Sequence, residues 1–178
     1  RRLYIGTIEG LAAFRRTNPG GGVPQWEYLG KFEETVTAEV RDVYPMEDGS
    51  VWVNGFTSGL FHIVSKDGGP VSPDKPHEVR LYDEDDGLVD GGSAVIELFD
   101  ELYFGGLDTC YRFDEETGKF NPIPDFESVR GLGGQIYAIP YSKDTFILNL
   151  QGLASFVTKG DDGSYILDPT PFSAFRAQ

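Results

Sequence analysis

Cysteine, methionine and histidine are scarce in this sequence of 178 residues, which has one Cys, one Met and two His. The single cysteine, Cys110, excludes an internal disulfide and a multi-cysteine zinc site, so we expect it to be a small buried apolar residue. No apolar run approaches the roughly 18 residues that a membrane span needs, and no charged-then-apolar leader opens the chain. We therefore expect no membrane contact by this segment.

Cationic residues are also few, with 15 Lys and Arg against 29 Asp and Glu and a formal net charge of −14. A surface this acidic repels a phosphate backbone, so we expect no nucleic-acid partner. An acidic excess of this kind is typical of a solvated surface and does not require a cationic ligand.

Catalytic motifs are absent as well. The sequence has no Gly-x-Ser-x-Gly elbow, His-Glu-x-x-His or phosphate loop, and His62 and His77 lie in different predicted segments. Glycoside hydrolysis needs two carboxylates about 5 to 9.5 Å apart, and the many acidic residues do not single out one pair. We predict that the chain is not an enzyme, and a propeller hydrolase or lyase is kept as an alternative.

Aromatic and turn-forming residues are abundant, with 13 Phe, nine Tyr and two Trp beside 23 Gly and 11 Pro. This mixture favours β-strands separated by tight turns. No stretch has a sustained 3.6-residue apolar period, so we expect almost no helix and an all-β fold.

An aromatic-centred apolar triplet followed by a second short apolar run occurs four times. The triplets centre on Tyr4, Trp52, Tyr103 and Phe146, which are spaced 48, 51 and 43 residues apart. Repeats of about 40 to 50 residues that each form a four-stranded antiparallel sheet are typical of β-propeller blades. We predict a β-propeller of about four blades of four antiparallel strands, in one domain over residues 1–178. The repeats run roughly over residues 3–35, 36–83, 84–127 and 128–172.

The first repeat has three predicted strands, because it lacks an inner strand. A further strand at residues 173–176 brings the total to sixteen, and it either completes the first blade or begins a fifth. The chain also opens at Arg1 without a methionine. We expect the chain to be a fragment of a larger propeller. Such a fragment exposes sheet faces, and formation of a homodimer would cover them.

Two segments, residues 43–63 and 86–114, contain an inner strand, a tight turn, an aromatic strand and a second apolar strand. They resemble the two-component regulator propeller repeat, and Asp86-Gly87-Leu88 matches its usual lead-in. The resemblance implies a periplasmic or extracellular sensor segment of a histidine kinase or hybrid regulator. It also implies a ligand-sensing role, with a small carbohydrate-derived molecule or a protein as the partner.

Ligands of propellers bind at one end of the central channel, beside the loops that join the second strand to the third and one blade to the next. In such a site Arg130 would hold a carboxylate or sulfate, although pairing with Glu127 is the simpler role. The candidate ligand-binding residues are Thr7, Glu9, Arg41, Thr57, Ser58, Asp108, Thr109, Arg130 and Gln151.

A dense acidic stretch precedes Gly87 and contains Asp83, Asp85 and Asp86. Several oxygen ligands on a tight turn suit Ca²⁺, so these residues are weak candidates for a calcium site. The stretch lacks the bidentate acid of an EF-hand, and a polar loop would look the same. We expect no cofactor, and calcium is the alternative.

These observations favour a non-catalytic ligand-sensing or ligand-binding propeller segment. A protein-interaction or structural platform is the first alternative, and it would have a broad apolar or acidic patch. A propeller hydrolase or lyase is the second, and it would have converging acids or histidines with perturbed pKa values.

Overall fold

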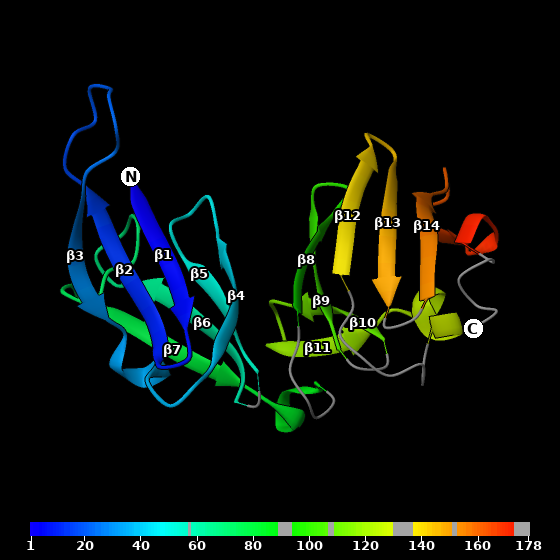
Figure 1. The fold of residues 1–178 in the computed structure, drawn as a ribbon. Helices are drawn as coiled ribbons and strands as arrows, with labels where there is room; N and C mark the ends of the chain where they lie inside the picture. Colours follow the sequence, from blue (N-terminus) through cyan, green and yellow to red (C-terminus); the bar gives the residue numbers. More distant parts are fainter. Residues whose placement is uncertain (57, 89–93, 107–108, 130–136, 151–152, 173–178) are drawn as a thin grey trace. The chain divides into compact units, whose positions relative to one another are not determined.

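The computed structural model describes residues 1–56, 58–88, 94–106, 109–129, 137–150 and 153–172. These residues form antiparallel β-sheets joined by turns and three short 3₁₀ helices (Figure 1). No helix in the described ranges has the length and apolar character of a membrane span. The chain divides into two compact units, Arg1–Asp83 and Glu84–Gln178.

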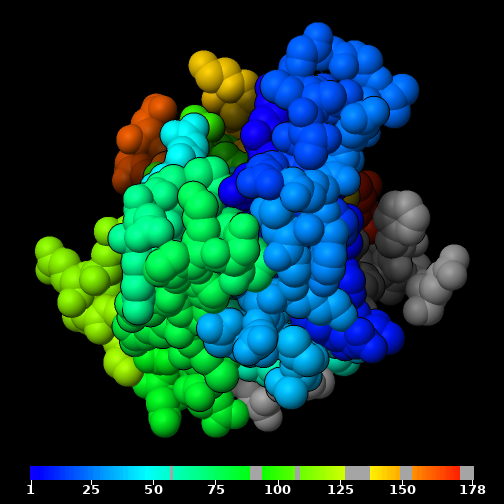
Figure 2. All heavy atoms as spheres, turned by 90° about the vertical axis from the view of Figure 1, so that its left-hand side faces the viewer, coloured from blue at the N-terminus to red at the C-terminus, as the bar shows by residue number. Residues whose placement is uncertain are grey.

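The first unit contains two sheets, in which strands adjacent in the chain pair with one another. Blade 1 has three strands, β1 (Arg2–Thr7), β2 (Gly10–Arg16) and β3 (Trp26–Lys31). Blade 2 has four strands, β4 (Val40–Pro45), β5 (Val51–Gly55), β6 (Gly59–Ser65) and β7 (His77–Tyr82). The 3₁₀ helix η1 (Glu33–Thr35) lies between the blades in the chain. Figure 2 shows this unit from the side on which β3, in light blue, and β7, in green, are exposed.

The second unit repeats this plan with two four-stranded sheets. Blade 3 consists of β8 (Ala94–Leu98), β9 (Glu101–Gly105), β10 (Cys110–Asp114) and β11 (Lys119–Pro122). Blade 4 consists of β12 (Tyr137–Ser142), β13 (Thr145–Leu150), β14 (Leu153–Lys159) and β15 (Tyr165–Asp168). The 3₁₀ helices η2 (Glu84–Asp86) and η3 (Pro124–Val129) precede blades 3 and 4.

The predicted all-β fold of about four propeller blades is confirmed, including the three-stranded first sheet. The predicted strand at residues 173–176 lies outside the described residues. The turn between β8 and β9 consists of two residues, because β8 ends at Leu98 and β9 begins at Glu101. Phe99 and Asp100 form this turn with φ angles of 54° and 61°, the left-handed conformation that a two-residue hairpin loop requires.

Among the described residues, each unit has a core that forms where its two blades meet. In the first unit Leu11 and Ala13 of blade 1 pack with Val51, Val53 and Ile63 of blade 2, and all five are fully buried. The core of the second unit is built in the same way from side chains of blades 3 and 4. Apolar side chains on a blade are therefore buried by the neighbouring blade, as in a propeller.

Cys110 lies in the core of the second unit and is fully buried, as predicted. Burial raises the pKa of its thiol to about 12. Because the thiolate is the reactive form of cysteine, this side chain acts as an apolar core residue.

In both units, a backbone hydrogen bond joins the segment that follows the outermost strand of a blade (β3 or β11) to the start of the strand beside it (β2 or β10). In the first, the Phe32 amide donates to the Leu11 carbonyl over 3.0 Å, and the Thr35 amide donates to the Phe32 carbonyl. In the second, Ile123 donates to the Cys110 carbonyl over 2.9 Å. The repeat is therefore present in the connections between the blades as well as in the strands.

The fourth repeat differs from the predicted alignment. Tyr4 packs toward the following blade, where it meets the cluster that contains Val51. Phe146 instead packs toward the preceding blade, against the cluster that contains Tyr103. Since side chains along a strand alternate between faces, Phe146 matches Val51, and Ile147 takes the aromatic position. The alignment of Phe146 with the central aromatic residues is therefore wrong by one residue.

Thr35 offers a test of the connection between blades 1 and 2. Its fully buried hydroxyl accepts a hydrogen bond from the Leu11 amide over 2.9 Å and donates one to the Phe32 carbonyl over 2.8 Å. Thr35→Val leaves a buried N–H without an acceptor, so the free energy of unfolding should fall by about 1–3 kcal/mol. The exposed Thr37→Val should change it by less than about 0.5 kcal/mol. Urea denaturation measures both variants, and equal stabilities would contradict this role for Thr35.

Candidate functional site

Two of the predicted ligand-binding residues, Thr7 and Glu9, lie in the turn between β1 and β2. The Thr7 hydroxyl donates to the Gly10 carbonyl over 2.8 Å and accepts from the Glu9 amide over 3.1 Å. The Glu9 carboxylate accepts from Lys31 Nζ over 2.7 Å, and this hydrogen bond lowers its pKa. Both side chains thus have partners that stabilise the turn.

Arg41 and Ser58 lie at the same end of blade 2. Arg41 Nε donates to Glu39 Oε1 over 3.0 Å, and its guanidinium lies 3.2 Å from the centroid of the Phe56 ring. The Ser58 amide donates to the Gly55 carbonyl in the tight turn between β5 and β6. The guanidinium of Arg41 is therefore already held by an acid and an aromatic ring.

Thr109 is buried, and its carbonyl accepts a hydrogen bond from the Gly106 amide over 2.9 Å. Thr57, Asp108, Arg130 and Gln151 lie outside the described residues. A ligand-binding role for the nine candidate residues stays a prediction.

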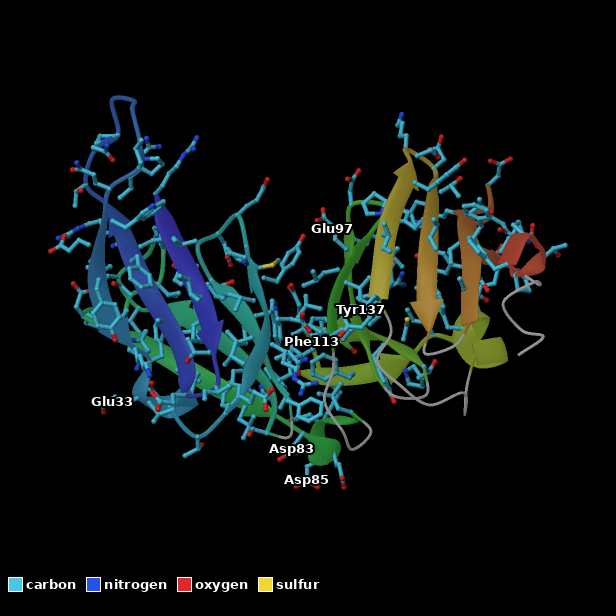
Figure 3. All side chains as sticks on the ribbon, in the orientation of Figure 1. Glu33, Asp83, Asp85, Glu97, Phe113 and Tyr137 are labelled. Atoms are coloured by element: carbon cyan, nitrogen blue, oxygen red, sulfur yellow. The ribbon has the colours of Figure 1, made fainter. Side chains whose placement is uncertain are left out.

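The weak calcium candidates are Asp83, Asp85 and Asp86, and Figure 3 labels the first two where the chain leaves β7 and enters η2. Lys119 Nζ donates to the Asp85 carbonyl over 2.7 Å and lies 3.4 Å from Asp86 Oδ1. An ammonium group thus already satisfies two of the oxygens that a cation would use. Within the described ranges no group of three or more acidic, His or Cys side chains is arranged to hold a metal ion.

A pocket of about 230 Å³ lies at the opposite end of the first unit, between the start of β1 and two turns of blade 2. Its volume is below the roughly 300–1,000 Å³ of most ligand pockets, so it suits a small ligand or a single functional group. The lining residues are Arg2, Tyr4, Pro45, Met46, Glu47, Asp48, Gly49, Ser50, Gly69 and Pro70.

Close backbone packing forms one wall of this pocket. The Val71 amide donates to the Gly49 carbonyl over 3.0 Å, and the Tyr4 hydroxyl donates to the Val71 carbonyl over 2.8 Å. A Cβ atom on Gly49 would lie 2.5 Å from the backbone of Gly69, and Gly49 has a φ of 91°. Position 49 therefore requires glycine, and the two turns of blade 2 are held together beneath β1.

Arg2 supplies the cationic group of the pocket. Its Nε atom is buried and donates no hydrogen bond to any described residue. Its cross-strand neighbour Arg15 is neutralised, because two nitrogens of its guanidinium contact Glu27 Oε2 at 3.0 and 2.6 Å. Burial raises the pKa of Tyr4 to about 12, so its hydroxyl is neutral. The pocket thus presents a guanidinium with an unused buried donor.

The equivalent positions in blades 2 and 3 have partners. Ser50 occupies this position in blade 2, and its hydroxyl lies 3.1 Å from His62 Nε2. Glu101 occupies it in blade 3, where its carboxylate accepts from Lys159 Nζ over 2.6 Å, from the Tyr103 hydroxyl over 2.6 Å and from Arg112 over 2.9 Å. The hydrogen bond from Lys159 is the main reason for the lowered pKa of Glu101. Arg2 is thus the exception among these three positions.

This pocket was not predicted from the sequence, because ligands of propellers are expected beside the loops at the other end of the blades. One signal was available, since Arg1, Arg2, Arg15 and Arg16 gather cationic charge on one pair of strands in an acidic chain. The register pairs Arg2 with Arg15, so only one of the two cations contacts Glu27 on β3.

Comparison with known proteins identifies no matching family model and no matching curated protein. The resemblance to the two-component regulator propeller repeat therefore stays a prediction, and the candidate site is defined by geometry and chemistry.

His62 contacts Ser50, which lines the pocket, and its burial there can be tested through the pH dependence of stability. The imidazole stacks on Trp52 with ring centroids 4.0 Å apart, and burial lowers its pKa below the usual 6.5. The unfolded chain therefore binds a proton more readily than the folded one, so stability is retained above about pH 6.5 and is lost as the pH falls below it. His62→Gln removes this group, and its unfolding free energy should decrease less between pH 7.5 and 5.5 than that of the wild type. Urea denaturation at the two pH values measures this difference, and equal decreases would contradict it.

Proposed function

We propose that this chain is a non-catalytic propeller segment that binds a small anionic ligand in the pocket beside Arg2 and serves as the sensing part of a signalling receptor. The observation that carries the proposal is the buried Arg2 Nε, which has no acceptor among the described residues. Such a donor costs about 1–3 kcal/mol, which a ligand with a suitable acceptor recovers on binding.

The chemistry of the pocket favours a carboxylate or sulfate. A guanidinium presents parallel N–H donors that match the two oxygens of such a group. The apolar side chains of Met46 and Pro70 and the neutral ring of Tyr4 line the same space and suit the body of a small ligand. Glu47 and Asp48, which are exposed, disfavour an anion that is not held directly by Arg2.

The resemblance to sensor propellers supports a carbohydrate-derived ligand and a periplasmic or extracellular location. A sugar acid combines such a ligand with the required carboxylate. Fold by itself supports no particular ligand, so the proposal depends on Arg2.

Arg2→Gln tests the proposal with galacturonate as the probe and galactose as its uncharged counterpart. Calorimetric titration at constant ionic strength should show binding of galacturonate by the wild type and weaker or no binding of galactose. Because a hydrogen bond to a charged group contributes about 1.5–3 kcal/mol, R2Q should weaken galacturonate binding at least about tenfold.

Arg15→Gln is the matched control. It removes a cation directly opposite Arg2 in the register, but that cation already contacts Glu27, so galacturonate affinity should stay within about threefold of the wild type. Equal binding by the wild type and R2Q, or equal binding of galactose and galacturonate, would overturn the assignment of the pocket.

A second candidate function is a protein-interaction platform. It is favoured by a different observation, namely that the chain exposes large apolar side chains on two sheet faces. These faces lie outside the pocket.

A further inference from the structure

Each blade has two faces, which differ in what they pack against. The forward face of a blade is the one that packs on the next blade in the chain, as Tyr4, Leu11 and Ala13 of blade 1 do in the first unit. The rear face packs on the preceding blade, as Val51 and Val53 of blade 2 do. Contact between a forward face and a rear face thus makes the core of this unit.

The second unit follows the same rule. The forward face of blade 3 contributes Ile96 and Tyr103, and the rear face of blade 4 contributes Phe146, Leu148 and Val157. Both of these cores, as the described residues form them, are therefore forward-to-rear contacts.

The rear face of blade 1 is apolar and exposed. Leu3, Phe14 and Tyr28 are successive partners across β1, β2 and β3, and the rings of Phe14 and Tyr28 lie 5.3 Å apart. Leu3, Ile5 and Tyr28 are 36%, 42% and 56% exposed. The equivalents of Leu3 and Ile5 in blade 2, Val51 and Val53, are completely buried by a forward face.

The forward face of blade 4 is also apolar and exposed. Ile139, Ile147 and Phe156 are successive partners across β12, β13 and β14. The ring of Tyr141 lies 5.0 Å from that of Phe156. Ile139, Tyr141 and Ile166 are 51%, 66% and 57% exposed. Exposed apolar clusters of this kind mark interaction surfaces.

The two surfaces are complementary in kind and in charge. One is a rear face and the other a forward face, so together they repeat the contact that forms both cores of the chain. Residues 1–31, which include blade 1, carry five cationic and two acidic side chains. Residues 137–172, which include blade 4, carry two cationic and four acidic side chains. The net charges have opposite signs, although the whole chain is strongly acidic, and this favours contact between the two ends.

We infer that copies of this chain associate head to tail, with the forward face of blade 4 in one copy packed on the rear face of blade 1 in the next. The contact joins two different surfaces, so it is heterologous. Two copies form a closed assembly if both contacts are made at once, and longer chains of copies form if they are not. The inference does not depend on the anion pocket, because neither surface includes a residue that lines it.

The test uses one variant of each surface, with sedimentation velocity and light scattering as the readouts. The wild type should form dimers or larger species as its concentration rises through the micromolar range. Ile5→Glu disrupts the rear face of blade 1, and Tyr141→Glu disrupts the forward face of blade 4. Each variant alone should remain a monomer, because it has no intact partner for its remaining surface.

Mixing the two variants separates head-to-tail association from other modes. The I5E protein keeps its forward face and the Y141E protein keeps its rear face, so an equimolar mixture should form a one-to-one heterodimer. A dimer that joined two identical surfaces would not be restored by mixing. Ile8→Glu is the control, because Ile8 is 79% exposed in the turn after β1 and belongs to neither surface. It should associate like the wild type.

Circular dichroism and urea denaturation of each variant establish that it is folded, which is expected because the substituted side chains are exposed. A wild-type protein that remains a monomer at all concentrations would overturn the inference. So would two variants that stay monomeric when mixed while each keeps the wild-type fold.

Discussion

The burial of apolar side chains by a neighbouring blade is the constraint on which the rest of this structure depends. A single sheet of four short strands is apolar on both pleats, and a neighbouring sheet has to cover each of them. Val51 and Val53 are completely buried for this reason, while their equivalents Leu3 and Ile5 are exposed. The core of each unit is therefore a contact between blades, and the buried Thr35 and its hydrogen bonds stabilise the first of these contacts.

This arrangement leaves the ends of the strands free to differ among the blades. Arg2, Ser50 and Glu101 occupy one position of the repeat, but Ser50 contacts an imidazole and Glu101 contacts three donors. Of these three side chains, Arg2 is the one whose buried donor has no acceptor among the described residues. The scaffold sets where such a side chain lies, and the neighbouring turns decide whether it is satisfied or available. Binding chemistry can therefore differ from one junction to another.

Much of the fold was predictable from the sequence, because the aromatic triplets, the glycine-containing turns and the spacing of the repeats are local signals. The fourth repeat was misaligned by one residue for a physical reason. Phe146, Ile147 and Leu148 are all apolar, so the alternation of polar and apolar residues that identifies a face is missing. The loop residues Thr7, Glu9 and Arg41 were expected at a ligand site, but the structure gives each of them a partner close by.

The strands, their order, the acidic character of the chain and the burial of Cys110 follow from composition and from short-range patterns in the sequence. Which face of each blade is covered depends on the tertiary structure. The tertiary structure also places Arg2 beside two turns that lie more than 40 residues away in the chain. The reason is that burial depends on what packs against a surface, and contacts between distant segments are not encoded in any local stretch of residues.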